Sequence, residues 1–358
     1  MPNNRVQRLR GLLPALGGDA VLITNEVNRR YLTGFTGSSG VVLISGSEAA
    51  LLTDFRYREQ APKQAIGFEI VEHAADVYAT VAELLQKWGV KRLLFEDQHV
   101  TFASYTSIRE KLAPVELVPA GTPVEQLRMV KDEGELAIIQ QAADIADQAF
   151  THILSHLKPG VTERQIALEL EFFMRSLGAS GTSFDTIVAS GERSAMPHGV
   201  ASDRVIGRDE FVTLDYGASY QGYVSDITRT VVVGRAGDKH REIYGIVLES
   251  QLYALERLKP GMTGREGDAL TRDIITRYGY GDHFGHGTGH GIGMEIHEAP
   301  RLSRMASDTI LTPGHVVTVE PGIYLPGFGG VRIEDDVVLT DAGIKILTHS
   351  PKELIVLD

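Results

Sequence analysis

The chain has 358 residues, of which 43% are hydrophobic and 23% charged. This is a globular composition, and the length predicts two domains. The formal net charge of −12 argues against a nucleic-acid or anionic-membrane partner, because phosphate binding needs a basic surface. There is no cysteine, so disulfides and thiolate metal sites are excluded, and any metal would have oxygen and nitrogen ligands.

The first residues do not read as a signal peptide, because Arg10 and then the Gly17-Gly18 pair interrupt their apolar residues. No later apolar run is long enough to span a bilayer. We therefore expect a soluble, cytoplasmic protein with no membrane partner.

Strands and helices alternate from about residue 5 to residue 119. Strands are predicted at residues 20–24, 41–45, 49–53, 68–72, 92–95 and 116–118, and helices at 6–16, 77–88 and 102–112. Such alternation is typical of an α/β layer structure with a partly parallel sheet. Arg29-Arg30-Tyr31 and the glycine-rich segment 34–40 are interpreted either as surface charge and a turn, or as a contribution to a neighbouring active site. The turn-rich segment 119–123 places a domain junction near residue 125.

The remaining residues combine helix pairs with strands. Helices are predicted at 132–157, 163–177, 239–258 and 265–278, and strands at 186–189, 211–230 (as a hairpin), 316–324 and 331–339. Thr162 is expected to cap the second of these helices, with Gln165 as its capping-box partner. The helix-ending sequence Leu-Lys-Pro-Gly occurs at residues 157–160 and again at 258–261. Two helix pairs, each followed by a hairpin that bears carboxylates, indicate an internal duplication.

The first of these hairpins contains two aspartates. With a two-residue turn at Tyr220-Gln221, Asp215 would lie directly across the ladder from Asp226. A sheet normally avoids two opposed carboxylates, so a cation is expected between them. The alternative is that both are aspartates near a turn on a solvated face.

Residues 285–298 place His286, His290 and His297 among five glycines. So many glycines exclude a stable helix and predict a strand or loop that another part of the backbone approaches closely. Nucleotide binding is discounted, because no helix clearly follows and no lysine stands in a phosphate-loop position. A single histidine is most often structural, whereas three within twelve residues indicate a site.

The second hairpin turns near Gly327 and sets Glu320 opposite Glu334. The alternative is an ordinary ion pair between Arg332 and Glu334, which would leave Glu320 without a partner. Together the two hairpins and one histidine supply five ligands. This number suffices for two metal ions about 3.5–4 Å apart that share bridging carboxylates.

The sequence resembles the metallopeptidase family that includes aminopeptidase P, prolidase and methionine aminopeptidase. The matching stretches are SAMPHG (194–199), LDYG (214–217), SDITRT (225–230), HGTGHGIGMEIHE (286–298), VTVEPGIY (317–324) and VRIEDD (331–336). The resemblance implies an α/β creatinase-like N-terminal domain at residues 1–125 and an α+β pita-bread catalytic domain at residues 126–358. The N-terminal domain argues against plain methionine aminopeptidase.

The resemblance also implies roles for individual residues. The implied metal ligands are Asp215 on one ion, Asp226 and Glu334 as bridges, and His290 and Glu320 on the second ion. The substrate pocket would be lined by His198, His286 and His297, and Arg332 would orient a bridging carboxylate or the substrate. The carboxylate-rich set favours Mn²⁺ or Co²⁺, with Zn²⁺ as an alternative.

The expected reaction is hydrolysis of the bond before proline, in small peptides with proline at the second position. Glu320 would shuttle the proton, and His297 would stabilise the oxyanion, with His198 in the same catalytic set. Arg301 is the candidate for binding the free carboxylate of a dipeptide. An Xaa-Pro dipeptidase is therefore favoured over aminopeptidase P, which acts on longer peptides. The family leads us to expect a homodimer.

Two alternative functions belong to other classes of protein. A creatinase-like enzyme works without metal, and a non-catalytic binding protein of this fold would have lost ligands. Both are disfavoured, because all five ligand positions are filled in this sequence.

Overall fold

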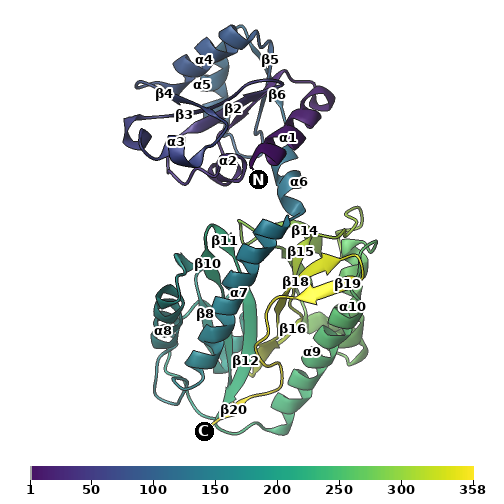
Figure 1. Ribbon diagram of the computed structural model, residues 1–358. Coiled ribbons are helices and arrows are strands. Elements are labelled where there is room, and N and C mark those ends of the chain that lie inside the picture. Colours follow the sequence, from purple (N-terminus) through teal and green to yellow (C-terminus); the bar gives the residue numbers. More distant parts are fainter. Residues whose placement is uncertain (1) are drawn as a thin grey trace. The chain divides into compact units, whose positions relative to one another are not determined.

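The computed structural model describes residues 2–358 (Figure 1). The chain divides into two compact units, of which the first ends at Arg128 and the second begins at Met129. The junction proposed near residue 125 falls inside helix α6 (Pro123–Met129), which the turn-rich composition did not predict. No helix within the described range is long and apolar enough to cross a membrane.

The first unit is an α/β structure on a six-stranded sheet in the order β4-β3-β2-β1-β5-β6. The strands are β1 (Ala20–Ile23), β2 (Val41–Ser45), β3 (Ala49–Thr53), β4 (Glu69–Glu72), β5 (Arg92–Phe95) and β6 (Glu116–Pro119). β5 is parallel to β1 and β6, and β3 is parallel to β4, whereas β2 is antiparallel to both its neighbours. The predicted partly parallel sheet is therefore confirmed.

Among the described residues, five helices precede α6, namely α1 (Pro2–Leu16), α2 (Glu26–Thr33), α3 (Ala61–Gln64), α4 (Val77–Trp88) and α5 (Phe102–Leu112). Two of them, α2 and α3, were not predicted. The unpredicted helix of regular length is α2, which Asn25 caps and which Gly34 ends with a φ of 76°. Arg29 on α2 is buried and donates to the carbonyl oxygens of Gly37 (2.6 Å) and Gly40 (2.8 Å). Its interpretation as surface charge is wrong, because it holds the glycine-rich loop in place.

The second unit contains two helix pairs and two larger sheets. The helices are α7 (Glu133–Ile153), α8 (Glu163–Ser176), α9 (Asp238–Arg257) and α10 (Gly264–Arg277). One sheet has the order β20-β12-β9-β8, with strands Val356–Leu357, Ile227–Val233, Glu210–Tyr216 and Ile187–Ser190. The other has the order β14-β13-β15-β18-β19, with strands Glu298–Leu302, Gly289–Gly291, Val316–Val319, Asp335–Thr340 and Gly343–Ile346.

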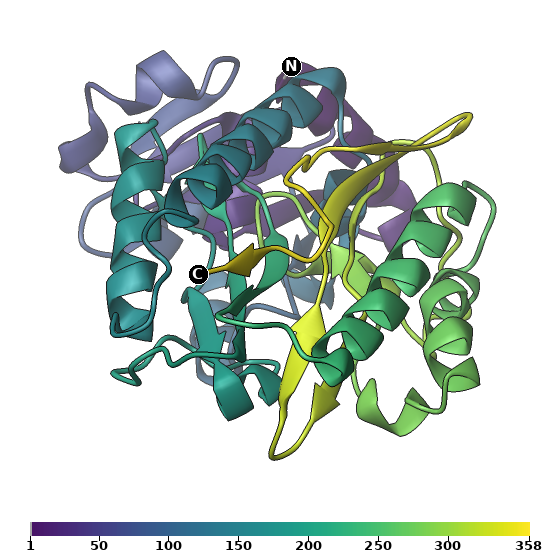
Figure 2. The same ribbon diagram turned by 90° about the horizontal axis from the view of Figure 1, so that it is seen from below.

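Two small sheets complete the unit: β11-β10-β7 (Tyr223–Val224, Ala218–Tyr220, Gly181–Thr182) and β16-β17 (Gly322–Leu325, Gly329–Arg332). Figure 2 shows the α7–α8 pair and the α9–α10 pair on opposite sides of the strands. The α7–α8 pair shares a hydrophobic cluster with β8, β9 and β12, and α9 shares one cluster with β15 and β18 and another with β9 and β12. The strands therefore lie between two helical layers.

The internal duplication is visible in backbone hydrogen bonds. After the first Leu-Lys-Pro-Gly, Gly160 donates to the carbonyl of Ile206 at 3.0 Å, and Ile206 donates back to Val161 at 2.8 Å. After the second, Gly261 and Leu311 form the same pattern at 2.9 and 2.8 Å. Capping boxes follow at both places, the predicted Thr162–Gln165 pair and its counterpart Thr263–Glu266. The duplication expected from the repeated sequence is confirmed.

The first hairpin differs from its predicted register. Its turn lies at Gln221-Gly222, with φ of 49° and 86°, so Asp215 pairs with Thr228 and not with Asp226. The predicted turn and the predicted pairing are both wrong, because a type I′ turn needs two positive φ angles and glycine supplies the second most easily. The correction is two residues along the strand, an even number, which preserves the face of each side chain.

The second hairpin has the predicted register. β15 and β18 pair Val319 with Asp335, and β16 and β17 pair Gly322 with Arg332, so that both ladders share one register. Between the two ladders the strands separate, and Glu320 lies opposite Glu334 at the gap. Both carboxylates are thereby placed where the sheet opens.

Candidate metal centre

A cavity of about 720 Å³ in the second unit is lined by all five proposed ligands, namely Asp215, Asp226, His290, Glu320 and Glu334. Two of them lie within strands β9 and β13. The other three stand at strand ends, directly before β12, after β15 and before β18. Strand ends can bring ligands together around a cavity, because the ladder stops there. The side chains can then converge without competing for the same cross-strand position.

The imidazole of His290 is oriented by its own strand. Its Nδ1 donates to the carbonyl of Gly291 at 3.0 Å, which leaves Nε2 with a free lone pair toward the cavity. Nε2 lies 3.4 Å from Glu320 Oε1 and 3.7 Å from Asp226 Oδ2. Burial lowers the pKa of His290 to about 4, so the ring is neutral at pH 7 and able to bind a metal.

The carboxylates of Asp226 and Glu334 are buried, and not every oxygen of theirs has a hydrogen-bond donor. One oxygen of Glu334 accepts from the Thr228 hydroxyl at 2.6 Å, whereas its other oxygen and Oδ1 of Asp226 have no hydrogen-bond partner. An unsatisfied buried polar atom costs about 1–3 kcal/mol. Burial, and next the mutual repulsion of the carboxylates, raises the pKa of both residues well above the ordinary range.

These observations test whether the residues fit a metal. Donor atoms of Asp226, His290 and Glu334 all lie within 4.8 Å of one another. Burial also raises the pKa of Glu320 to about 7, although the nearby Arg332 opposes the shift. Divalent cations would satisfy the orphaned oxygens and neutralise the repulsion. The donor set therefore fits divalent metal ions.

Arg332 neutralises one carboxylate of the cavity. Its guanidinium forms a buried ion pair with Asp215, donates to Tyr324 Oη at 2.9 Å and donates through Nε to Thr228 Oγ1 at 3.0 Å. The alternative interpretation of an Arg332–Glu334 pair is wrong, since Arg332 faces Asp215 instead. Burial raises the pKa of Asp215, and Arg332 is the main influence that lowers it.

Several groups that contact the proposed ligands were not found from the sequence. Thr228 contacts Glu334, and Thr318 Oγ1 accepts from the His290 backbone N–H (3.1 Å) and donates to Glu320 Oε1 (3.1 Å). The backbone N–H of Asp226 donates to Asp336 Oδ2 at 2.9 Å. Both threonines lie two residues from a proposed ligand, a spacing that shares a face on a strand and could have identified them.

The histidines and the arginine proposed for substrate also line the cavity. These residues are His198, His286, His297 and Arg301, and they are accompanied by apolar side chains that include Phe184, Ile187 and Ile296. The His297 ring contacts the His290 ring edge to face at a centroid distance of 4.4 Å. His286 shares a hydrogen bond of 2.8 Å with Tyr324 Oη. The lining of the cavity is thus rich in imidazole and apolar side chains.

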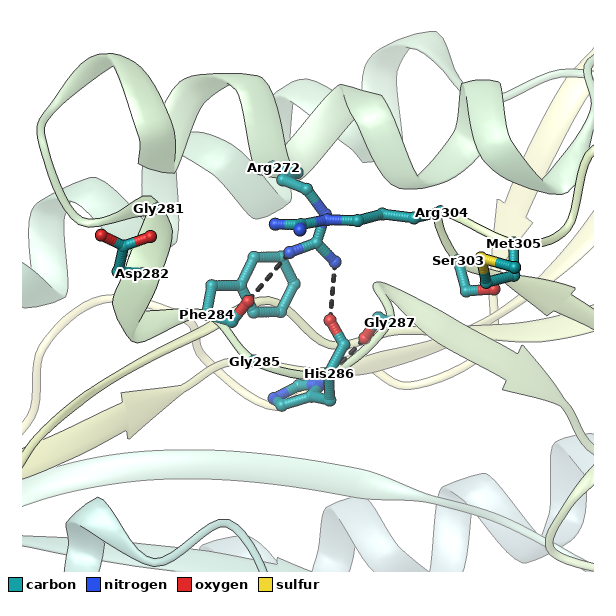
Figure 3. A pocket seen from close by; sticks show the side chains of 10 residues that line it. All are labelled: Arg272, Gly281, Asp282, Phe284, Gly285, His286, Gly287, Ser303, Arg304 and Met305. Atoms are coloured by element: carbon teal, nitrogen blue, oxygen red, sulfur yellow. Dashed lines mark hydrogen bonds between the residues drawn. The ribbon is translucent and has the colours of Figure 1, made fainter.

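A buried ion pair on α10 supports the segment that leads to His290. Arg272 pairs with Asp268 and donates to the carbonyl oxygens of Phe284 (2.9 Å) and His286 (2.6 Å), beside a second cavity of about 390 Å³ (Figure 3). Asp268 Oδ1 in turn accepts from the backbone N–H of Thr288 at 2.9 Å. Side chains of α10 therefore hold the backbone at Phe284, His286 and Thr288, just before β13.

The predicted close approach of backbone at the glycines is also confirmed. A Cβ on Gly289 would lie 1.9 Å from the carbonyl oxygen of Thr318, and one on Gly291 would lie 2.3 Å from that of Ala299. Only glycine lets β13 come this close to its neighbours while it carries His290 between them.

A duplicated α+β unit that gathers four carboxylates and one imidazole around a cavity defines a metal-dependent hydrolase with the pita-bread fold. The chain belongs to metallopeptidase family M24, which matches residues 137–341, and residues 5–130 match the creatinase/prolidase N-terminal domain. M24 metallopeptidases are dinuclear divalent-metal enzymes. The family and the fold class predicted from the sequence are confirmed.

Three solved structures illustrate the similarity. An Xaa-Pro dipeptidase from Bacillus anthracis is 55% identical, with 100% of both chains covered and a TM-score of 0.98. An X-Pro aminopeptidase from Thermotoga maritima is 42% identical, covers 96% of this chain and 99% of its own, and gives a TM-score of 0.91. A prolidase from Pyrococcus horikoshii is 40% identical, covers 99% of this chain and 100% of its own, and gives a TM-score of 0.93.

Proposed function

We propose that the protein is an Xaa-Pro dipeptidase, which hydrolyses the bond between the two residues of a dipeptide that ends in proline. The similar chains from Bacillus anthracis and Pyrococcus horikoshii, an Xaa-Pro dipeptidase and a prolidase, support this substrate class. The observation that carries the choice of a dipeptide is the position of Arg301 beside the proposed metal ligands.

Arg301 is directly opposite His290 in the β13–β14 ladder and lines the same cavity. Directly paired residues have Cβ atoms about 4.5–5.5 Å apart. None of the hydrogen bonds or ion pairs of the described residues engages its guanidinium, and the residue is exposed at the cavity wall. An arginine without other partners in the described range, next to the proposed metal ligands, is suited to bind the carboxylate of a C-terminal proline. A longer peptide would place an amide there instead.

The proposed metal ligands are Asp215, Asp226, His290, Glu320 and Glu334, with Mn²⁺ or Co²⁺ as the favoured ions and Zn²⁺ as an alternative. When bound, the ions would supply a nucleophilic hydroxide at neutral pH and polarise the substrate carbonyl. The chain's own residues then position the substrate and move the protons.

The proton transfer is assigned to Glu320. Its carboxylate lies in the cavity, and Thr318 fixes one of its oxygens at 3.1 Å, so the other remains free to exchange a proton. Glu320 would take a proton from the attacking water and deliver it to the prolyl nitrogen, which carries no N–H in the substrate and needs a proton to leave. His297, with His198, would stabilise the negative charge on the carbonyl oxygen. His286 and the apolar wall would hold the pyrrolidine ring.

The test compares Gly-Pro with Arg-Pro-Pro on the Mn²⁺-loaded protein. We expect a preference for the dipeptide. Arg301→Gln should lower kcat/KM for Gly-Pro by about 10–100-fold, because a hydrogen bond to a charged group contributes about 1.5–3 kcal/mol. Its activity on Gly-Pro-amide, which has no carboxylate, should not change. Arg304→Gln is the matched control, since Arg304 lines the second cavity and not the first.

Aminopeptidase P activity on longer peptides is the second candidate. The similarity to the Thermotoga maritima X-Pro aminopeptidase favours it, because the same scaffold carries that activity. Preference for Arg-Pro-Pro over Gly-Pro, with an Arg301→Gln variant that behaves as the wild type, would establish it instead. Fewer than one bound ion per chain after Mn²⁺ loading would contradict both candidates and favour the creatinase-like enzyme or the binding protein.

A further inference from the structure

A second group of metal-binding side chains lies outside the catalytic cavity, at the C-terminal end of α7. His152 stands in the last turn of α7, His156 in the turn that follows, and Glu169 on α8 faces both. Their donor atoms all lie within 4.8 Å of one another. The two histidines are four residues apart and therefore project from one face of the helix end.

The two imidazoles are already directed at the carboxylate. His152 Nε2 lies 2.6 Å from Glu169 Oε1, to which it donates a proton that a bound metal ion would displace to solvent, and His156 Nε2 lies 3.7 Å from the same oxygen. The His152 ring is stacked on Phe173 at a centroid distance of 3.9 Å and an interplanar angle of 9°, which fixes its plane. Nδ1 of His156 lies 3.2 Å from the His152 carbonyl oxygen and 3.2 Å from Ser155 Oγ, and the Ser155 hydroxyl donates to the same carbonyl. Nδ1 is therefore the donor, and Nε2 keeps its lone pair.

The spacing suits a tetrahedral ion. Zinc bonds of about 2.0–2.2 Å to nitrogen and oxygen place neighbouring ligand atoms roughly 3.4 Å apart. The separation of 3.7 Å between His156 and Glu169 is close to that value, and the 2.6 Å between His152 and Glu169 would have to open by less than about 1 Å. The three side chains are 26%, 41% and 38% exposed, so water can complete the coordination.

We propose that His152, His156 and Glu169 form a third metal site, which binds Zn²⁺ or a similar imidazole-preferring divalent ion and links the end of α7 to α8. Two imidazoles and one carboxylate prefer Zn²⁺, Ni²⁺ or Cu²⁺ to Mn²⁺, in contrast to the carboxylate-rich catalytic set. The bound ion would fix the turn before Pro159, next to the hydrophobic cluster that contains Phe150 and Leu170. The proposal is independent of the substrate, because none of these residues lines the catalytic cavity.

The test counts Zn²⁺ ions in the full-length protein after chelator treatment, by equilibrium dialysis and elemental analysis. We expect His156→Ala to bind one ion fewer per chain than the wild type. Glu169→Gln should lower the affinity for that ion at least tenfold. His349→Ala is the matched control, since the exposed His349 lies 3.7 Å from Asp147 without a second histidine. It should bind as many ions as the wild type.

The test measures a difference of one Zn²⁺ ion per chain between the wild type and His156→Ala. The result therefore does not depend on how many ions the catalytic cavity binds. Zn²⁺ should also raise the melting temperature of the Mn²⁺-loaded wild type more than that of His156→Ala, and hydrolysis by the Mn²⁺-loaded variants should equal that of the wild type. Equal Zn²⁺ counts in the wild type, His156→Ala and Glu169→Gln would overturn the proposal and leave an ordinary surface ion pair. A count that falls equally in His349→Ala would overturn it as well.

Discussion

Threonine hydroxyls set the direction of two carboxylates in the catalytic cavity. Thr228 donates to Glu334 at 2.6 Å and accepts from Arg332 at 3.0 Å, and Thr318 links the His290 backbone to Glu320. In Glu334 the Thr228 hydroxyl occupies one carboxylate oxygen, and the other oxygen has no hydrogen-bond partner. Groups of this kind hold metal ligands in place, and their loss typically weakens metal binding by about 10–100-fold.

Thr228→Val is therefore expected to weaken Mn²⁺ binding by about 10–100-fold while the variant stays folded, because valine keeps the β-branched shape but not the hydroxyl. Equilibrium dialysis measures the affinity, and circular dichroism checks the fold. Thr228→Ser restores the hydroxyl and should bind Mn²⁺ within a few-fold of the wild type. Wild-type affinity in Thr228→Val would show that the hydroxyl does not orient Glu334.

Asp226 is a proposed ligand that is expected to destabilise the metal-free protein. Its Oδ1 has no partner, and burial followed by the charge of Glu334 raises its pKa. Asp226→Asn removes a charge without changing the shape. We expect hydrolysis of Gly-Pro to fall by about 10³-fold or more, since a metal contributes several kcal/mol of charge stabilisation. The melting temperature of the metal-free variant should equal or exceed that of the wild type.

Those two measurements separate a ligand from a structural residue. A large loss of melting temperature in metal-free Asp226→Asn would indicate that the carboxylate stabilises the fold. Near-normal turnover in the Mn²⁺-loaded variant would reject the bridging role. Only the combination of lost hydrolysis and retained stability supports the assignment.

At the scale of elements, β13 depends on glycines to reach its position. The strand has three residues, and it brings His290 between β14 and β15. A Cβ at Gly289 would lie 1.9 Å from the Thr318 carbonyl oxygen, which belongs to backbone and cannot rotate away. Any side chain there would push β13 off β15 and displace the imidazole.

Gly289→Ala is expected to destabilise the protein by about 3 kcal/mol, at the upper end of what overpacking usually costs, and to weaken metal binding as well. Gly245→Ala is the control, because Gly245 is exposed within α9 and a Cβ there would meet nothing within 4 Å. Alanine in a helix interior should stabilise by about 0.5–1 kcal/mol. Urea denaturation of both variants measures the difference, and equal stability would contradict the close contact.

The elements also show how far the sequence alone could go. The register of the second hairpin was predictable, because the glycine-rich turn around Gly327 left little choice. In the first hairpin Gln221 adopts an unusual positive φ, which no residue preference indicates, and the predicted pairing was displaced by two residues. The choice of proposed ligands was not affected, because an even displacement keeps Asp215 and Asp226 on their predicted faces.

Contacts between elements that are distant in the chain could not be predicted from the sequence. The Asp226 backbone bonds to Asp336, and Arg332 pairs with Asp215 across the two hairpins. No local pattern encodes such partners, since they depend on how the two halves of the unit meet. The glycine-rich histidine segment, by contrast, was correctly expected to be a close-packed strand or loop, because glycine content acts locally.

For the whole molecule, the duplicated halves of the second unit both contribute to the proposed metal centre. The first half supplies Asp215 and Asp226, and the second supplies His290, Glu320 and Glu334. Buried like charges from the two halves repel each other without metal, and bound ions would turn the repulsion into attraction. The centre is thus expected to act as a cross-link within this unit.

Metal removal should therefore loosen the second unit and leave the first unchanged. At a free Mn²⁺ concentration 100 times the Kd, each bound ion adds about 2.7 kcal/mol to the free energy of unfolding. Hydrogen-exchange mass spectrometry with and without Mn²⁺ should show greater protection of β9, β12, β15 and β18 when metal is present, whereas β1 and β5 of the first unit should exchange at the same rate. The Asp226→Asn variant should show no such gain. Equal gains in both units, or a gain retained in this variant, would mean that Mn²⁺ stabilises the protein at places other than the proposed centre.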